Sequence, residues 1–301
     1  MPLDPQLQAL VDASNAAAAE LPPIAEQSVA DRRDGYAAMI PIFGAGPELD
    51  HVSDLEIAGV PCRRYGDNGA AGCFVYIHGG GYVIGDLDTH DEVCRQLASQ
   101  AACTVISVDY RLAPEHPFPA GINDAWAVLK AIDADRASYG ANAGIVVGGD
   151  SAGGNFSAVL ALMARDAGVD LAAQLLVYPA VDMNDKSPSL AENGEGYLLT
   201  QESMEWFSEQ YQPDPDDWRA SPLFADSHNG VAPALIITAE FDPLRDQGAI
   251  YADKLRGAGV DVTLTNYPGM VHVFFQLGQI CDGGATAVTQ VADAARAALA
   301  S

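Results

Sequence analysis

The chain has 301 residues, 49% of them hydrophobic, which is enough to bury a large core as one α/β domain or two small ones. Its formal charge is −26, from 41 acidic and 15 basic residues, and no cluster of lysine or arginine is present that could hold phosphates. Nucleic acid and anionic membrane surfaces are therefore excluded as expected partners. The acidity fits either plain solubility or adaptation to a salty medium, and neither specifies a chemistry.

Cysteine usage and the N-terminus indicate a reducing compartment. The five cysteines are an odd number without CxxC spacing, so we expect small buried residues, with a lone disulfide as the alternative. Residues 1–5 hold no basic region or apolar signal core, and no apolar run approaches the roughly 18 residues of a membrane span. The sequence predicts a cytoplasmic, soluble protein, and it leaves monomer and homodimer open.

The predicted elements change in kind along the chain. Residues from about 4 to 40 predict two helices broken by Leu21-Pro22-Pro23, and residues 51–57 and 60–65 predict an antiparallel hairpin. Beyond the hairpin, apolar strands alternate with helices, which is typical of a mostly parallel sheet with helices on both faces. The strands are expected at 73–77, 104–108, 145–147, 174–178, 234–238 and 262–266, and the helices at 89–101, 121–137, 152–167, 246–257 and 284–300.

One polar, proline-rich stretch, residues 182–217, interrupts this alternation and contains one helical piece at 201–211. It is too long for an ordinary connection in a compact domain, which favours a lid. A plain linker is the alternative, but the helical piece is too apolar for that, with Met204, Trp206, Phe207 and Tyr211. We therefore expect a catalytic domain at 46–301, capped by the N-terminal helices of residues 1–45 and by the insertion at 182–217.

The first chemical motif is His78-Gly79-Gly80-Gly81, directly after the expected strand 73–77. Glycines let the backbone come close to a reacting carbonyl and aim N–H groups at a developing oxyanion. A dinucleotide or phosphate loop is the alternative, but GxGxxG spacing is absent and no Lys-Ser/Thr follows. The motif therefore favours an oxyanion loop.

The second motif, Gly149-Asp150-Ser151-Ala152-Gly153, falls between an expected strand and an expected helix. A strand, a sharp turn with serine at its apex and a helix form the nucleophile elbow of an α/β-hydrolase. Glycines flank the serine because the turn leaves no room for Cβ atoms. The N–H of Ala152 would serve as an oxyanion donor. We expect Asp150 to point away from the serine and to act as scaffold.

Serine needs a base to take its proton, and in this fold the chain order is serine, acid, histidine. Four of the six histidines precede Ser151. Of the other two, His228 lies in a polar loop, whereas His272 follows two further strands in a loop that could return to the serine. His272 is therefore the expected base.

The acid should follow the end of a strand, and Asp242 does so after Ala234–Glu240. Pro243 then stops the strand. Two carboxylates are rivals: Glu240, expected on the strand, and Asp246, expected on the following helix. We expect Asp242 to hold the tautomer of the histidine.

These motifs, taken in order, resemble the hormone-sensitive-lipase-like esterases, bacterial family IV. The matching segments are His78-Gly-Gly-Gly, Asp109-Tyr-Arg-Leu-Ala-Pro-Glu115, Gly149-Asp-Ser-Ala-Gly-Gly154, Asp242-Pro-Leu-Arg-Asp246 and His272. The resemblance runs from about residue 50 to the end of the chain, and the N-terminal helices and the 182–217 insertion resemble the cap of that family.

The resemblance implies a serine carboxylesterase that hydrolyses short-to-medium-chain acyl esters through an acyl-enzyme, with no cofactor and no metal. It implies oxyanion donors at Gly80, Gly81 and Ala152, with Gly79 as a turn residue. An amidase or formamidase could use the same triad. A silent ligand-binding receptor on this fold is a further alternative, although such relatives are expected to lose a triad member and none is missing here.

Other residues have both a functional and a structural interpretation. Tyr82, Met204 and Phe207 could line an acyl pocket, or they could be simple packing. The prolines around 110–119 would fix a loop in which Arg111 and Glu115 could form a buried ion pair.

Overall fold

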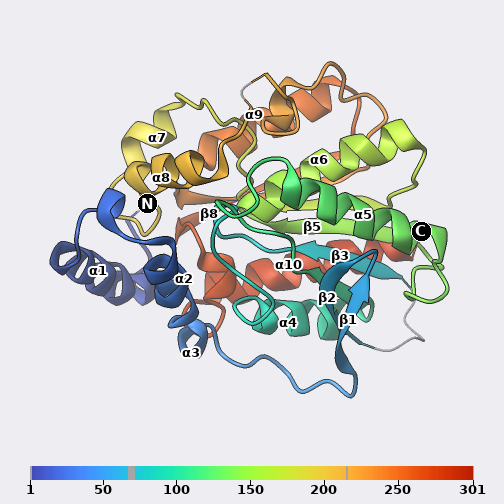
Figure 1. The fold of residues 1–301 in the computed structure, drawn as a ribbon, viewed down its shortest axis with the longest axis horizontal. Helices are drawn as coiled ribbons and strands as arrows, with labels where there is room; N and C mark the ends of the chain where they lie inside the picture. The colour runs from blue at the N-terminus through green and yellow to red at the C-terminus, as the bar shows by residue number, and fades with distance from the viewer. Residues whose placement is uncertain (1, 67–71, 215, 301) are drawn as a thin grey trace.

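The computed structural model describes residues 2–66, 72–214 and 216–300, so Met1, residues 67–71, Pro215 and Ser301 of the predicted ranges lie outside the described residues. Within them, eight strands form one sheet in the order β1-β2-β4-β3-β5-β6-β7-β8 (Figure 1). The strands are β1 Val52–Ile57, β2 Val60–Tyr65, β3 Cys73–Ile77, β4 Thr104–Val108, β5 Ile145–Asp150, β6 Ala173–Val177, β7 Ala234–Phe241 and β8 Val262–Val271.

The α-helices are α1 Pro5–Glu20, α2 Val29–Ala37, α3 Ile40–Phe43, α4 Asp91–Ala101, α5 Ala120–Ala134, α6 Ala152–Ala167, α7 Pro188–Asn193, α8 Gln201–Tyr211, α9 Arg245–Gly257 and α10 Asp282–Leu299. The short 3₁₀ helices are η1 Ile24–Glu26, η2 Pro222–Phe224 and η3 Phe274–Gln276.

The sheet topology confirms the predicted α/β-hydrolase fold. Strands β1 and β2 form the predicted antiparallel hairpin, and β2 also runs antiparallel to β4. From β4 to β8 all neighbouring strands are parallel. Every residue of β3, β4, β5 and β6 is buried, because helices cover both faces of a parallel sheet.

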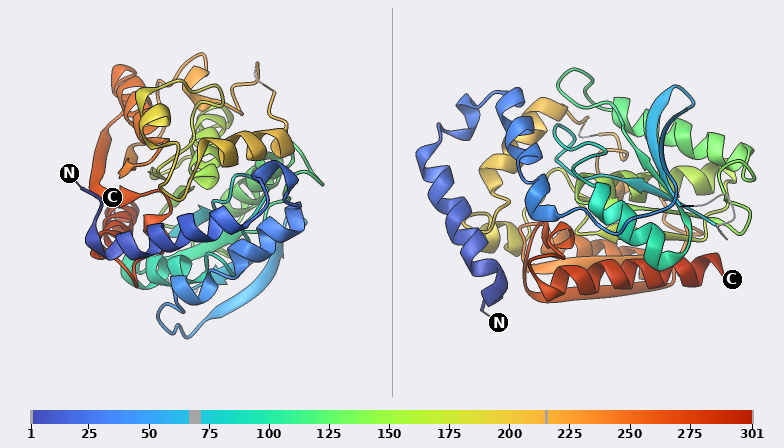
Figure 2. Two further views of the ribbon diagram at one scale, coloured as in Figure 1. Left: turned by 90° about the vertical axis from the view of Figure 1, so that its left-hand side faces the viewer. Right: turned by 90° about the horizontal axis from the view of Figure 1, so that it is seen from below.

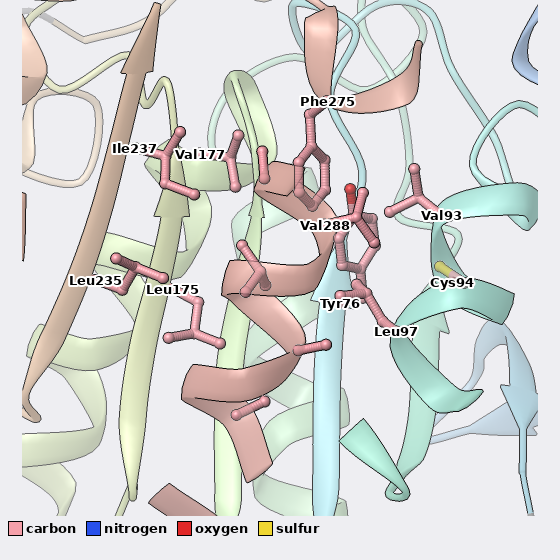
Figure 3. Close-up of a cluster of buried hydrophobic side chains, with 14 of the residues drawn as sticks. Tyr76, Val93, Cys94, Leu97, Leu175, Val177, Leu235, Ile237, Phe275 and Val288 are labelled. Atoms are coloured by element: carbon pink, nitrogen blue, oxygen red, sulfur yellow. The ribbon is translucent and has the colours of Figure 1, made fainter. Parts of the chain in front are cut away.

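The side chains of each strand alternate between two helical layers. Leu175, Val177, Leu235 and Ile237 face α10, and Val93 and Leu97 of α4 complete the same cluster (Figure 3). The other face of the sheet packs against α5, α6 and α9. Full burial of one such aliphatic side chain stabilises a fold by about 2 kcal/mol, so these two layers hold the strand ends rigidly in place.

Two parts of the prediction needed correction. Strands β5, β7 and β8 run several residues beyond the predicted ends. Gly148, Gly149 and Asp150 still pair with β6, and Ala239 and Phe241 of β7 still pair with Tyr267 and Val271 of β8. Helix α7 was not predicted, because it has only six residues and begins at Pro188 without apolar periodicity. Helix α8 has the predicted bounds, 201–211.

The N-terminal helices α1 and α2 lie beside α7 and α8 at one end of the sheet (Figures 1 and 2). Several contacts join these distant segments of the chain, of which two are examples. The side-chain amide of Asn15 donates to the carbonyl of Gly196 at 3.1 Å, and the guanidinium of Arg32 lies 5.1 Å from the ring of Trp206.

Candidate active site

Ser151 occupies a sharp turn between β5 and α6. Its backbone has φ 54° and ψ −115°, outside the regions that a non-glycine residue ordinarily adopts. A Cβ atom at Gly149 or at Gly153 would collide with the carbonyl oxygen of Ile77. Glycine on both sides therefore lets the turn sit directly against β3, with the serine at the start of a helix.

Three side chains from the carboxyl ends of β5, β7 and β8 meet in one hydrogen-bonded chain. Ser151 Oγ lies 2.9 Å from His272 Nε2, and His272 Nδ1 lies 2.7 Å from Asp242 Oδ2. Asp242 is fully buried and His272 is 3% exposed. A carboxylate only accepts hydrogen bonds, so Nδ1 carries the imidazole proton and Nε2 is free to accept the serine proton.

Asp242 is itself fixed in place, because its Oδ1 accepts the backbone N–H of Leu244 at 2.8 Å. The two rival carboxylates have other partners. Glu240 accepts the N–H of Gly269 at 2.7 Å, and Asp246 pairs with Arg245 at 2.8 Å. Of the three carboxylates, the structure brings Asp242 to His272.

His228 is buried elsewhere, where its Nε2 lies 2.9 Å from the carbonyl oxygen of Pro222 and its ring meets Tyr251 edge-on. It does not approach Ser151.

The predicted oxyanion loop follows β3 and turns at Gly80. The carbonyl of Gly80 accepts the N–H groups of Val83 and Ile84, at 3.1 and 2.9 Å. In the part of the chain that the structure describes, the N–H groups of Gly80 and Gly81 donate to no acceptor. Together with the N–H of Ala152 at the first turn of α6, they are available for a developing oxyanion.

Asp150 points away from the serine, as predicted, and anchors the oxyanion loop. Its Oδ1 accepts the Tyr76 hydroxyl at 2.7 Å and the Gly79 N–H at 3.0 Å, and His90 Nε2 lies 3.5 Å away. Burial alone would raise the pKa of this carboxyl, but the nearby His90 and Tyr76 lower it overall. Asp150 therefore stays ionised beneath the loop.

His78 lies in the same buried cluster. Its ring stacks on Tyr110 with centroids 4.3 Å apart, and its Nδ1 lies 2.7 Å from the carbonyl oxygen of Gly79. Burial, together with the neighbouring His90, lowers the pKa of His78 to about 4. His78 is therefore neutral at neutral pH and serves the structure of the loop.

A cavity of about 1300 Å³ opens onto Ser151 and His272. Gly80, Gly81, Ala152 and all three predicted pocket residues, Tyr82, Met204 and Phe207, line it. A Cβ atom at Gly81 would collide with the ring of Phe207, so α8 lies directly against the oxyanion loop.

The four apolar residues of the predicted helical piece, now α8, have different surroundings in the structure. Met204 and Phe207 line the cavity. Trp206 is buried beneath Arg32, and the ring of Tyr211 stacks on the ring of Tyr82 with centroids 3.9 Å apart. Helical spacing explains the position of Trp206, because residues 204, 207 and 211 share one stripe and residue 206 does not. Tyr211 continues that stripe but meets Tyr82 instead of lining the cavity.

Sequence reasoning missed several cavity residues. Arg32 and Tyr36 come from α2, and Leu198 and Leu199 precede α8. The apolar Leu198-Leu199 pair before the helix cap at Thr200 was a usable signal. Nothing local in the sequence places α2 at the cavity.

The expected Arg111–Glu115 pair does not form. Arg111 instead binds Asp124 at 2.7 Å, and Glu115 binds Arg33 of α2 at 2.8 Å. Arg111 and Glu115 are both about half exposed, so the expectation of a buried pair was wrong on burial as well. The true partner of Glu115 lies 82 residues away, beyond the reach of any local pattern.

All five cysteines fall within the described ranges and are free and buried, which confirms the expectation of small core residues. Among the helices that the structure describes, none has the length and apolar character needed to cross a membrane.

Comparisons with known proteins agree on one family. A family model for the alpha/beta hydrolase fold matches residues 74–276. The carboxylic ester hydrolase LipN of Mycobacterium tuberculosis is 41% identical, over 99% of this chain and 83% of the relative. The ethyl acetate hydrolase of Pseudomonas putida is 38% identical, over 98% of each chain. The solved structure of an esterase from Pyrobaculum calidifontis superposes with a TM-score of 0.93 at 39% identity, over 99% of each chain.

Proposed function

Since the chain belongs to the α/β-hydrolase family, in its hormone-sensitive-lipase-like branch, and is a serine hydrolase of carboxylic esters, we propose that Ser151, His272 and Asp242 are its catalytic triad. One observation carries the proposal: the hydrogen bonds from Ser151 to His272 and from His272 to Asp242 are 2.9 and 2.7 Å long. Both fall within the distances over which a positioned base takes a proton.

In the acylation step, Ser151 Oγ attacks the carbonyl carbon of the ester while its proton passes to His272 Nε2. Asp242 stabilises the imidazolium that forms. The carbonyl oxygen becomes an oxyanion, which the N–H groups of Gly80, Gly81 and Ala152 stabilise. The bond between the carbonyl carbon and the alcohol oxygen then breaks, and His272 gives its proton to the departing alcohol.

In the deacylation step, water takes the place of the alcohol. His272 accepts a proton from the water, whose oxygen attacks the carbonyl carbon of the acyl-Ser151. The second tetrahedral oxyanion forms in the same site and collapses. The carboxylic acid is released, and the proton on His272 returns to Ser151 Oγ.

We further propose that the cavity accepts the acyl part of short-to-medium-chain esters. Phe207 stands against Gly81, next to the oxyanion loop, and Met204 lies one helical turn away from it on α8. Tyr82 is held by its stacking on Tyr211. A wall of this kind accepts several carbons before an acyl chain meets bulky side chains. The partner is a small acyl ester, which reacts with water.

Residues 1–45 and 182–217 are proposed as a cap over the catalytic domain 46–301. The support is that Arg32 joins the two segments, because its guanidinium lies 5.1 Å from the Trp206 ring and 5.3 Å from the Phe207 ring. We place the enzyme in the cytoplasm, for which the five free, buried cysteines are the support.

The test is hydrolysis of p-nitrophenyl butyrate by the Ser151→Ala variant. We expect a folded protein whose turnover falls by about 10⁴-fold or more, because both chemical steps pass through Ser151. The matched control is Ser227→Ala, which changes a serine of an exposed loop outside the cavity and should leave turnover unchanged. A Ser151→Ala variant with a tenth of the original activity would refute the nucleophile.

A further inference from the structure

Arg33, on helix α2, reaches out of the N-terminal segment to the oxyanion loop. Its Nε donates to the carbonyl of Val83 at 2.9 Å, and its Nη2 donates to the carbonyl of Ala113 at 3.0 Å. Nη1 and Nη2 each donate to a carboxylate oxygen of Glu115, both at 2.8 Å. One guanidinium therefore forms four hydrogen bonds to two separate loops.

The bond to Val83 leads to the Gly81 N–H through two planar peptide units. The Val83 carbonyl and the Ile84 N–H belong to one peptide plane, so fixing the first also fixes the second. The Ile84 N–H donates to the Gly80 carbonyl at 2.9 Å. The Gly80 carbonyl shares its own peptide plane with the Gly81 N–H. Gly81 lines the cavity, and its N–H has no acceptor among the described residues.

We propose that Arg33 is a positioning residue of the reaction, which orients and polarises the Gly81 N–H through this chain of two peptide units. The proposal rests on the assignment of Gly80 and Gly81 as oxyanion donors. Hydrogen bonds in a chain polarise one another, and a cation at one end makes the N–H at the far end a stronger donor. The N-terminal segment thereby acts on the chemical step.

The other anchors of the loop come from within the catalytic domain. The Tyr110 hydroxyl donates to the His78 carbonyl at 3.0 Å, and the Gly79 N–H donates to Asp150 at 3.0 Å. The Ala113 N–H donates to the Tyr82 carbonyl at 3.0 Å. The Ala113 N–H also reaches the Gly81 N–H, through the Tyr82–Val83 peptide unit, whose own N–H donates to the Gly80 carbonyl at 3.1 Å. That second chain begins at a neutral backbone amide, whereas the chain through the Val83–Ile84 peptide unit begins at the cation of Arg33.

The chemistry of the side chain matters here, because only a planar guanidinium can reach two carbonyls and a carboxylate together. The hydrogen bonds from Arg33 lower the pKa of Glu115 to about 2, so the carboxylate is ionised throughout the neutral range and orients the guanidinium. A lysine at position 33 would keep the positive charge but could not form these hydrogen bonds to two carbonyls and a carboxylate at the same time. The Arg33→Lys variant therefore separates geometry from charge.

The experiment measures kcat and KM for p-nitrophenyl butyrate and the inhibition constant of an alkyl trifluoromethyl ketone. Such a ketone adds the Ser151 oxygen and places a hemiketal oxyanion on the same N–H donors. For Arg33→Lys and Arg33→Met we expect kcat to fall about tenfold while KM stays within about twofold, because the lost interaction forms only in the transition state. The inhibition constant should rise by a similar factor.

Two variants calibrate the result. Glu115→Gln keeps both carbonyl bonds, so we expect kcat to fall by only about twofold. Arg136→Lys is the matched control. Arg136 also binds a carboxylate, that of Asp133, and a backbone carbonyl, that of Asp170, but it lies outside the cavity. It should change neither kcat nor the inhibition constant.

Wild-type kcat in Arg33→Lys would overturn the inference, as would a loss of kcat without weaker binding of the ketone. If Arg33→Met does not fold, the comparison of Arg33→Lys with Arg136→Lys decides. Ser151→Ala, assayed on the same ester, keeps the two questions apart. An active Ser151→Ala variant refutes the proposed triad, whereas wild-type kinetics in Arg33→Lys refutes only the role of Arg33.

Discussion

The carboxyl edge of the sheet and the proposed cap are built in different ways. Ser151, Asp242 and His272 follow the ends of β5, β7 and β8, and these strands are packed between two layers of helices. Helix α2 of the proposed cap has no buried residue, and α8 has three. The proposed triad, which requires fixed distances, therefore lies at the ends of well-packed strands, and the proposed wall of the acyl pocket comes from helices with few buried residues.

The largest effect should come from changing the acid at the carboxyl edge. We expect Asp242→Asn to lower kcat by about 10³-fold or more, because an amide favours the wrong tautomer of His272. Asp246→Asn is the matched control: four residues further on, Asp246 bonds to Arg245 and to the N–H of Ser189, and its loss should leave most activity intact. The reverse ranking in a p-nitrophenyl ester assay would show that the wrong carboxylate was chosen.

The buried cluster beneath the oxyanion loop should make the rigid part sensitive to acid. The pKa of His78 is lowered from 6.5 to about 4, so below pH 6.5 the unfolded chain binds a proton that the folded protein does not bind. Stability should therefore fall as the pH drops from 6.5 towards 4, by about 2 kcal/mol at pH 5 from this group alone.

Urea unfolding at pH 7.5 and pH 5 measures this loss of stability. The His78→Phe variant keeps an aromatic ring against Tyr110 but cannot titrate, so its stability should change less between the two pH values. An equal change in the two proteins would assign the acid sensitivity to other groups.

The smallest effect should come from the cap, as a shift in substrate preference. Phe207→Ala and Met204→Ala remove bulk from the cavity wall, so the preferred acyl chain should lengthen by several carbons. The exposed Phe224 offers a matched control in Phe224→Ala, because it lies outside the cavity. The measurement is the rate of each variant on p-nitrophenyl esters from butyrate to dodecanoate. An unchanged profile with lower stability would make Met204 and Phe207 packing residues, and the acyl wall would then be sought at Tyr82.

The same contrast between the two regions explains what the sequence could predict. Buried parallel strands show as short apolar runs, so β3 and β4 were predicted with their observed bounds. The site followed from them, because Ser151, Asp242 and His272 each come directly after a strand, in the chain order of the fold. The carboxyl ends of parallel strands lie at one edge of the sheet, so residues that directly follow different strands in the sequence lie near one another in the fold.

The cap contacts could not be predicted in this way. Arg33 lies 50 residues from Val83 and 82 residues from Glu115, and Arg32 lies 171 residues from Ser203. Such pairs depend on how separate segments of the chain dock, and hydrophobic periodicity within one segment does not predict that docking. This is why Glu115 was assigned to Arg111, its near neighbour, instead of to Arg33.

The central claim is that Ser151 becomes covalently acylated. The most direct test is to inactivate the wild-type protein with a p-nitrophenyl alkylphosphonate, which traps the nucleophile as a stable ester, and to map the adduct by peptide mass spectrometry. We expect one equivalent of p-nitrophenol, loss of esterase activity in proportion to labelling, and the added mass on Ser151. A stoichiometric adduct on another residue, or full inactivation with Ser151 unmodified, would contradict the account.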